Sequence, residues 1–368
     1  MNNKIVFVSS NHIFGGSEKL WVESALCLST SFEVVVFVNY KHSFLERLNI
    51  SNIQVIYSSE VKKVKNKLKS FVLRNDAEDL KLHLLKHKPL LVVYSKGAPF
   101  SSLKDLEMLV SINQKFVTIN QLISEYHWLN ISNANYNRFK LAYNRSEKNF
   151  FVSKNNLDLF TQMVGELENT DLISNPGDTK KSGFILYPKV EENFKIAFVG
   201  RFEFYHKGID LLLSALESPI WKSRNIEFNF YGEGPHKLIL QEWIRSKNLF
   251  FCKIQDFKDD ISEIWKINHI LVLTSRFEGK SLSISEASFY GRPTIATNVG
   301  GAMEQIENGK TGFLIDYLTI ESINSVLETA WMSRFQWEQM GVAAREKFLN
   351  DNPLDPVSLF VNKVREII

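Results

Sequence analysis

The chain is poor in cysteine and has no long run of apolar residues. Only two of its 368 residues are cysteines, Cys27 and Cys252, and they lack the spacing of metal ligands. Two distant cysteines in apolar surroundings indicate reduced core residues and predict a cytoplasmic protein. No run of about 20 apolar residues is present, so we expect no membrane-spanning helix. The apolar part of the segment MNNKIVFVSS is also shorter than a secretory signal needs.

The bulk composition is that of an ordinary globular protein. The chain is 44% hydrophobic and 23% charged, with a net charge of +3. Its length is enough for about two domains with full cores. The basic excess lies in the N-terminal half and is concentrated in residues 61–74, VKKVKNKLKSFVLR, which contain no acidic residue.

The apolar residues of 61–74 follow helical spacing, which predicts a basic amphipathic helix. Such a helix can lie on anionic lipid, where each Lys or Arg contributes about 1 kcal/mol, on the inner face of the cell membrane. The alternative is a solvated helix that packs one apolar stripe on the core. Nucleic acid is not an expected partner, because aromatic residues do not alternate with the basic ones.

Short apolar runs alternate with longer amphipathic stretches along most of the chain. The expected strands of the first half are Ile5–Val8, Val34–Val38, Ile53–Tyr57, Leu90–Tyr94, Phe116–Ile119 and Phe150–Val152. Those of the second half are Ile196–Val199, Ile226–Tyr231, Ile270–Leu273, Thr294–Ala296 and Phe313–Ile315. Such alternation predicts parallel sheets with helices on both faces.

A break in this pattern at residues 171–193 mixes Pro, Gly and charged residues and predicts a linker. We therefore expect an α/β protein of two Rossmann-like, doubly wound domains that face each other across a cleft. The expected domains are residues 1–175 and 176–352, with a C-terminal helix at about 353–368 packing back on the first. In such sheets, ligands bind outside the carboxyl ends of the strands.

The stretch from Arg276 to Glu286, RFEGKSLSISE, follows the expected strand Ile270–Leu273 and leads into a helix. A small-residue loop before a helix can bind an anion through free N–H groups and the helix dipole. Glu278 and Glu286 can take hydroxyl groups on either side of that anion, which suits a nucleotide-sugar. The alternative is a capping box, in which Ser283 pairs with Glu286 and the carboxylate only satisfies a backbone N–H.

Three further motifs follow expected strands. Gly15 and Gly16 precede a helix, and paired glycines let a backbone approach a phosphate closely. Arg201 and Lys207 lie at a strand end and a helix start, where a cation is unfavourable unless an anion is present. The alternative for this pair is solvent-facing loop charge. The Gly-Glu-Gly-Pro segment at 232–235 lacks the third glycine of a dinucleotide fingerprint and indicates a structural tight turn.

Together these segments resemble the family 4 glycosyltransferases, which are retaining enzymes of the two-domain GT-B architecture. The resemblance covers most of residues 195–316 in the family's order, through VGRFEFYHKGIDLLLSAL, YGEGP, SRFEGKSLSISEA and GRPTIATNVGGAMEQIENGKTGFLI. The FGGSE loop at 14–18 adds a match in the other half. The resemblance implies transfer of a hexose from a nucleotide diphosphate sugar to a hydroxyl acceptor, with retention of the anomeric configuration.

The resemblance also implies roles for individual side chains. Arg201 and Lys207 are expected to bind the diphosphate, and Glu278 to face the hydroxyl groups of the donor sugar. Glu286 is expected to hold the ribose hydroxyls. No Asp-x-Asp motif is present, which is the usual metal-holding signature of the other major glycosyltransferase fold. We therefore expect transfer without a metal ion or other cofactor.

Backbone groups complete the expected donor site. The N–H groups of Lys280, Ser281 and Leu282 are expected to meet the phosphates, with Gly15 and Gly16 closing from the other domain. These too are assignments that the family resemblance implies.

Two departures from the family pattern affect these roles. Lys280 and Ser281 stand where members often carry a small Gly or Pro and an apolar residue, and Lys280 is expected to add a phosphate or sugar contact. Asn120 and Gln121 stand where many members place a histidine after a strand. The nearest histidine is His127, which is either the acceptor-side catalytic residue or a buried, hydrogen-bonded structural residue.

The expected partners are a nucleotide-sugar donor and a glycan or lipid-linked acceptor. The basic N-terminal half favours an anionic or lipid-linked acceptor, as in bacterial surface polysaccharide or glycolipid assembly. Two alternatives stay open. One is a non-catalytic protein that binds nucleotide-sugars, and the other is an inverting transferase or an epimerase on the same fold.

Overall fold

The computed structural model describes residues 3–11, 15–51, 53–57, 76–97, 102–177, 185–256, 258–353 and 355–368. The chain divides into an N-terminal unit, residues 1–176 together with 355–368, and a C-terminal unit, residues 177–354. The predicted basic helix at 61–74 lies outside the described residues. None of the helices that are described is long and apolar enough to cross a membrane.

The N-terminal unit is built on a seven-stranded parallel sheet in the order β3-β2-β1-β4-β5-β6-β7. Its strands are β1 (Lys4–Ser9), β2 (Glu33–Val38), β3 (Gln54–Tyr57), β4 (Leu91–Lys96), β5 (Phe116–Asn120), β6 (Lys148–Phe151) and β7 (Thr170–Leu172). Its α-helices are α1 (Lys19–Leu28), α2 (Glu46–Ile50), α4 (Asp76–His87), α5 (Leu103–Ser111), α6 (Asn133–Asn144), α7 (Lys154–Val164) and α17 (Pro356–Ile367). Three 3-10 turns are η1 (Gly16–Glu18), η2 (Ser43–Leu45) and η4 (Glu125–Asn130).

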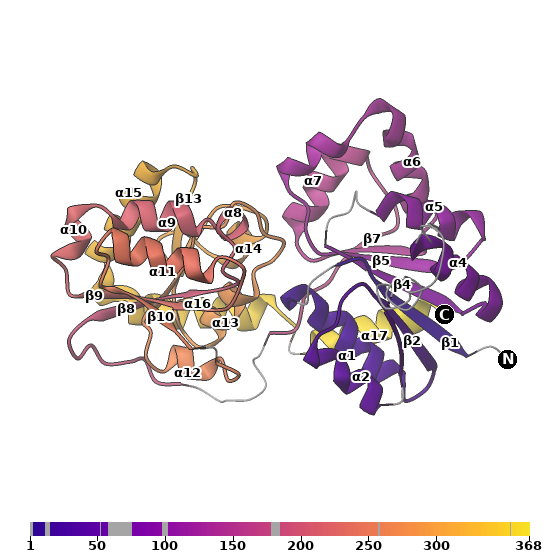
Figure 1. Ribbon diagram of the computed structural model, residues 1–368, viewed down its shortest axis with the longest axis horizontal. Coiled ribbons are helices and arrows are strands. Elements are labelled where there is room, and N and C mark those ends of the chain that lie inside the picture. Colours follow the sequence, from indigo (N-terminus) through magenta and orange to yellow (C-terminus); the bar gives the residue numbers. More distant parts are fainter. Residues whose placement is uncertain are drawn as a thin grey trace, which may run out of the picture. The chain divides into compact units, whose positions relative to one another are not determined.

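Helices cover both faces of this sheet, as Figure 1 shows. Helices α1 and α17 pack on one core, and α4 to α7 line the core on the other face. The last helix, α17, starts with Asp355 accepting a hydrogen bond from the Ser358 N–H at 3.1 Å, and Pro356 takes its first position. Its buried Phe360 meets the ring of Phe150 on β6 edge-on at 5.2 Å. The end of the chain thus belongs to the N-terminal unit.

The C-terminal unit is built on a six-stranded parallel sheet in the order β10-β9-β8-β11-β12-β13. Its strands are β8 (Phe194–Val199), β9 (Ile226–Tyr231), β10 (Cys252–Gln255), β11 (Ile270–Leu273), β12 (Thr294–Thr297) and β13 (Gly312–Ile315). Its helices are α8 (Phe204–Lys207), α9 (Ile209–Leu216), α10 (Pro219–Lys222), α11 (Lys237–Ser246), α12 (Ser262–Trp265), α13 (Leu282–Phe289), α14 (Ala302–Gln305), α15 (Ile320–Met332) and α16 (Trp337–Asp351), with the 3-10 turn η5 (Arg334–Gln336).

Both sheets have the doubly wound order that the sequence predicts. Each central strand is buried along nearly its whole length, as β11 is from Ile270 to Leu273, because helices cover both faces of a parallel sheet. The strand order reverses between β1 and β4 in the first unit and between β8 and β11 in the second. Ligands of doubly wound sheets bind at the carboxyl ends of such strands. A ligand site is therefore expected at the loops after β1, β8 and β11.

Candidate active site

A close contact between two backbones brings the loops after β8 and β11 together. Gly208 lies between α8 and α9 with φ of 61°, a left-handed conformation that favours glycine. A Cβ at this position would stand 1.8 Å from the carbonyl oxygen of Thr274, directly after β11. The Thr274 hydroxyl also donates to the Gly208 carbonyl at 2.9 Å. This approach places Lys207, the preceding residue, beside the loop that follows β11.

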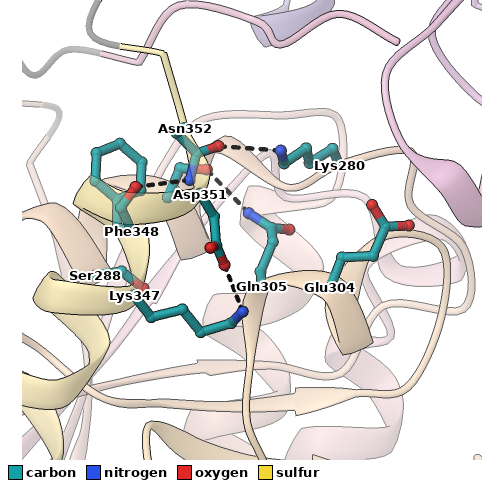
Figure 2. A pocket seen from close by; sticks show the side chains of 9 residues that line it. Lys280, Ser288, Glu304, Gln305, Lys347, Phe348, Asp351 and Asn352 are labelled. Carbon is teal, nitrogen blue, oxygen red and sulfur yellow. Dashed lines mark hydrogen bonds and ion pairs between the residues drawn. The ribbon is translucent and has the colours of Figure 1, made fainter.

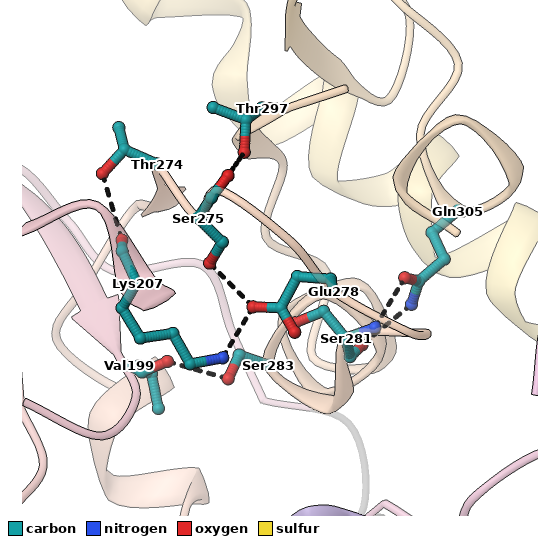
Figure 3. A network of polar contacts seen from close by, with 9 residues as sticks. All are labelled: Val199, Lys207, Thr274, Ser275, Glu278, Ser281, Ser283, Thr297 and Gln305. Atoms are coloured by element: carbon teal, nitrogen blue, oxygen red, sulfur yellow. Dashed lines mark hydrogen bonds and ion pairs between the residues drawn. The ribbon is translucent and has the colours of Figure 1, made fainter. Parts of the chain in front are cut away.

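Lys207 and Glu278 form an ion pair at this point. The Lys207 Nζ donates to Glu278 Oε1 at 2.6 Å, and the Ser275 hydroxyl donates to the same oxygen at 2.7 Å (Figure 3). The two charged side chains are only 17% and 14% exposed. Ser275 is itself fixed, because Thr297 on β12 donates to its carbonyl at 2.6 Å. The cation and the carboxylate thus stand at the switch point of the C-terminal sheet.

The Glu278 carboxylate is held in its charged form. Burial by itself would raise the pKa of Glu278. The positive charge of Lys207, the nearby His206 and the hydrogen bonds from Lys207 and Ser275 outweigh burial, so this pKa lies below its ordinary value. An ionised carboxylate with one oxygen engaged can accept hydrogen bonds from hydroxyl groups of a ligand.

A second set of contacts, which no local sequence pattern predicts, fixes the loop from Arg276 to Glu278. Arg276 binds both carboxylate oxygens of Asp210 on α9, at 2.8 and 2.7 Å, and its guanidinium lies over the Tyr205 ring. The His206 ring stacks on Phe277 with centroids 4.5 Å apart. Bidentate pairs of this kind fix geometry as well as adding energy. Arg276 and Asp210 are 66 residues apart, so only the fold reveals the pair.

The predicted diphosphate residue Arg201 lies in the loop after β8. Its side chain is 36% exposed, and its Nε stands 3.8 Å from Glu203 Oε2. The turn at 232–235 packs directly beneath it, since a Cβ on Gly232 would lie 1.9 Å from the Gly200 carbonyl oxygen. This close packing is what a structural turn requires.

Helix α13 begins at Leu282 with Ser281 as its N-cap. The side chain of Gln305 holds Ser281 at both backbone groups, accepting from its N–H at 3.1 Å and donating to its carbonyl at 2.9 Å (Figure 3). The Ser281 N–H, predicted to meet a phosphate, is therefore engaged within the protein. A Cβ on Gly300 would lie 2.0 Å from the Glu278 carbonyl oxygen, so Gly300 allows close packing against this loop.

Glu286 lies inside α13 and is only 5% exposed. The alternative interpretation of this residue as half of a capping box is wrong. Ser283 is not the cap, because Ser281 is, and the Ser283 hydroxyl donates instead to the carbonyl of Val199 on β8 at 2.8 Å. Glu286 is thus a buried carboxylate in the helix that follows the Glu278 loop.

The side chain of Lys280 makes a hydrogen bond within the C-terminal unit. Its Nζ donates to Asn352 Oδ1 at 3.0 Å, at the end of α16, as Figure 2 shows. Burial lowers the pKa of Lys280, and the nearby Glu304 and Asp351 oppose that shift. The side chain lines a small pocket of the C-terminal unit.

The predicted glycine loop of the N-terminal unit follows β1 at that sheet's switch point. Gly16 begins η1, and Gly15 has an extended backbone with open space around the position of a Cβ. The buried Gln121, directly after β5, donates to the Ser17 carbonyl at 3.0 Å and exchanges hydrogen bonds with Asn175. Gln121 therefore fastens this loop to the end of the N-terminal unit.

His127 is mostly buried within η4. Its Nδ1 accepts from the Ser124 N–H at 3.1 Å, and its backbone N–H donates to the Ser124 side chain. Burial lowers the pKa of His127, and Glu125 opposes that shift. These contacts form a capping box and favour the structural interpretation of His127 over the catalytic one.

The described residues offer no group of three or more His, Cys, Asp or Glu side chains suited to hold a metal ion. The C-terminal unit thus combines a doubly wound sheet, a buried Lys–Glu pair at its switch point and a helix N-terminus beside that pair. This combination defines the class: an α/β fold with a polar site at the strand ends, of the type that binds nucleotides.

Known proteins with similar sequences point to one family within this class. Residues 186–347, which lie within the C-terminal unit, match the family described as glycosyl transferases group 1. A protein of the cps region of Klebsiella pneumoniae is 32% identical over 157 residues, which are 42% of this chain and 41% of that protein. The poly(ribitol-phosphate) alpha-N-acetylglucosaminyltransferase of Staphylococcus aureus is 30% identical over 156 residues, which are 39% of this chain and 29% of that enzyme. The chain thus matches less than half the length of these relatives.

Solved structures extend the likeness to the whole fold. Anabaena HepE, in complex with UDP-glucose, superposes with a TM-score of 0.75 at 18% identity and covers 99% of this chain and 100% of its own. TarM superposes with a TM-score of 0.70 at 14% identity, covering 99% of this chain and 98% of its own. The architecture is that of the GT-B glycosyltransferases.

Proposed function

We propose that the protein is a retaining glycosyltransferase that moves a sugar from a nucleotide diphosphate sugar to a hydroxyl acceptor. The observation that carries the proposal is the buried Lys207–Glu278 pair at the switch point of a group 1 glycosyl transferase domain. The proposal assigns the Lys207 ammonium to the diphosphate and the Glu278 carboxylate to the sugar hydroxyls. These two groups are joined directly by a hydrogen bond. The UDP-glucose held by the structural neighbour HepE supports a nucleotide-sugar donor.

The proposed chemistry follows from charge. When the sugar leaves, negative charge grows on the nucleoside diphosphate, and Lys207, Arg201 and the N-terminus of α13 stabilise it. Glu278 accepts hydrogen bonds from the donor sugar and orients it. Glu286 takes the ribose hydroxyls. Attack on the same face of the sugar needs no enzyme nucleophile, so no further side chain is assigned to the step.

The acceptor is proposed as a glycan or lipid-linked hydroxyl in surface polysaccharide or glycolipid assembly. The relatives from a cps region and from poly(ribitol-phosphate) glycosylation support this choice. Peripheral contact of residues 61–74 with anionic membrane belongs to the same proposal. Replacing the five lysines of that segment by Gln should abolish binding to anionic vesicles at low salt while leaving donor binding unchanged.

The proposal is tested by turnover. A thermal-shift screen of UDP, GDP and ADP and their sugar conjugates identifies the donor, because a ligand at 100 times its Kd adds about 2.7 kcal/mol of stability. The identified donor is then incubated with an acceptor mixture, with and without EDTA, and the product linkage is determined by NMR. We expect an unchanged anomeric configuration and no effect of EDTA. An inverted product would refute retention, and binding without turnover would leave a non-catalytic nucleotide-sugar-binding protein.

A further inference from the structure

The side chain of Lys280 is committed to the end of helix α16. Its Nζ donates to Asn352 Oδ1 at 3.0 Å, and Asn352 Nδ2 donates onward to the Phe348 carbonyl at 3.0 Å. Asn352 is the C-cap residue of α16 (Figure 2). Lys280 thus joins the loop after β11 to the last helix of the C-terminal unit, two residues before the unit ends at Leu354.

The space around this contact is too small for a substrate. The pocket that Lys280 lines with Asn352, Asp351, Lys347 and Glu304 has a cavity volume of about 20 Å³. A cavity of that volume has room for one or two water molecules. The ammonium is therefore used inside the protein, in surroundings where Glu304 and Asp351 balance its charge.

Lys280 is the middle of three consecutive anchors on one loop. The Gly279 carbonyl before it accepts from the Gly301 N–H at 2.7 Å. Both backbone groups of Ser281 after it are held by Gln305. The Glu278 carboxylate precedes these three residues and the first N–H of α13 follows them. Because each of the three residues between them is held in place, the Glu278 carboxylate and the N-terminus of α13 keep a fixed distance and orientation.

We propose that Lys280 is a positioning residue: through its hydrogen bond to Asn352 it holds the loop that orients Glu278 and the N-terminus of α13, and it does not bind the donor. The inference rests on the proposed function, since it assigns the loop to donor binding. It replaces the expectation from the sequence that Lys280 adds a phosphate or sugar contact.

The test is a double-mutant cycle on the full chain with Lys280→Met, Asn352→Leu and the double variant. Each single change should lower kcat/KM for the donor about tenfold or more, since a misplaced group weakens the transition state. The kcat/KM of the double variant should be no lower than that of the less active single variant. Asn352→Asp keeps an acceptor oxygen for Lys280 but loses the hydrogen bond to the Phe348 carbonyl, so it should retain more activity than Asn352→Leu. Lys347→Met, which changes another lysine of the same pocket, is the matched control and should stay near wild type.

Binding of the nucleoside diphosphate alone, measured by calorimetry, separates positioning from contact. We expect the Kd of UDP, or of whichever diphosphate the screen selects, to change by the same factor in Lys280→Met and in Asn352→Leu, because both variants lose the same hydrogen bond. A tenfold loss of diphosphate affinity in Lys280→Met but not in Asn352→Leu would make Lys280 a ligand residue and overturn the inference. Additive effects on kcat/KM, or no effect, would overturn it as well.

The same cycle in thermal unfolding without ligand keeps the inference separate from the proposed function. Non-additive shifts in Tm are expected, because the two side chains contact each other. If no nucleoside diphosphate binds the wild type, the proposed function fails, while the unfolding cycle still decides whether the contact exists. Additive Tm shifts would show that the two side chains do not interact, and this would overturn the positioning role.

Discussion

Gly208 and Thr274 belong to different βα loops, and no side chain fits between them. A Cβ on Gly208 would stand 1.8 Å from the Thr274 carbonyl oxygen, and the glycine has φ of 61°. This approach sets Lys207 beside the loop that carries Glu278. The ion pair at the centre of the candidate site thus depends on a backbone contact that a single methyl group would disrupt.

Gly208→Ala should therefore lower both stability and activity. The left-handed backbone alone costs about 1–2 kcal/mol for a residue with a Cβ, and the overlap with Thr274 adds to that cost. Gly309→Ala is the matched control, because Gly309 has φ of 78° with open space around the position of a Cβ. Unfolding by urea, followed for both variants, should show the larger loss in Gly208→Ala. Equal losses would mean that the backbone conformation, not the close approach, makes glycine necessary.

Breaking the ion pair should affect turnover and stability together. Lys207→Met and Glu278→Gln should each lower kcat about 10²–10³-fold, because a preorganised charge is lost. Removing one partner of a buried pair also leaves the other uncompensated, at about 3–5 kcal/mol. Asp158→Asn is the control, since its pair with Lys154 is exposed and is expected to contribute less than about 1 kcal/mol. Activity within twofold of wild type in both site variants would contradict the assignment of Lys207 and Glu278 to the donor site.

The elements of this site could be predicted from the sequence only in part. Strand ends, glycine pairs and charged residues gave the order of the motifs and the loops that carry them. The strands β7 and β10 were not expected, because both are short edge strands with polar residues and lack the apolar run of a buried strand. The strand β11, four apolar residues buried on both faces, was predicted at its observed bounds.

Side-chain partners were the part that the sequence could not provide. The pair of Arg276 with Asp210 joins residues 66 positions apart, and that of Lys280 with Asn352 joins residues 72 positions apart. Local patterns carry no information on contacts of that separation. The capping-box interpretation of Ser283 and Glu286 failed for a similar reason, since the hydroxyl of Ser283 found the distant Val199 carbonyl instead.

Glu286→Gln tests the assignment of the ribose site. The substitution keeps the shape of the side chain and removes its charge, so it should weaken binding of the nucleoside diphosphate about tenfold or more, as expected for a charge-assisted hydrogen bond. Stability should change by less than about 1 kcal/mol, because Glu286 is not the cap of α13 and Gln keeps the shape of the side chain. Calorimetric titration and urea unfolding of the same variant give both quantities. The exposed Glu307→Gln is the control, and unchanged binding in Glu286→Gln would remove its proposed role.

The pH dependence of stability should report on His269, which is 1% exposed in the C-terminal unit. Burial lowers the pKa of His269 to about 4, and the charges of Arg292 and Lys195 act in the same direction. In the unfolded chain this histidine has its ordinary pKa of about 6.5. Between about pH 6.5 and pH 4 it therefore binds a proton in the unfolded chain but not in the folded protein. This contribution to stability is fully present above about pH 6.5 and is lost as pH falls toward 4, by roughly 2 kcal/mol at pH 5.

His269→Asn isolates this contribution. The Asn oxygen can accept from the Lys195 N–H, as His269 Nδ1 does at 2.9 Å, but it does not titrate. Burial also lowers the pKa of His83 in the N-terminal unit, so the wild type and the variant both lose stability in acid, and the difference between them carries the information. The apparent Tm, measured by calorimetry from pH 7 to pH 5, should fall less in His269→Asn than in the wild type. Parallel curves would show that His269 takes up its proton in the folded protein as readily as in the unfolded chain.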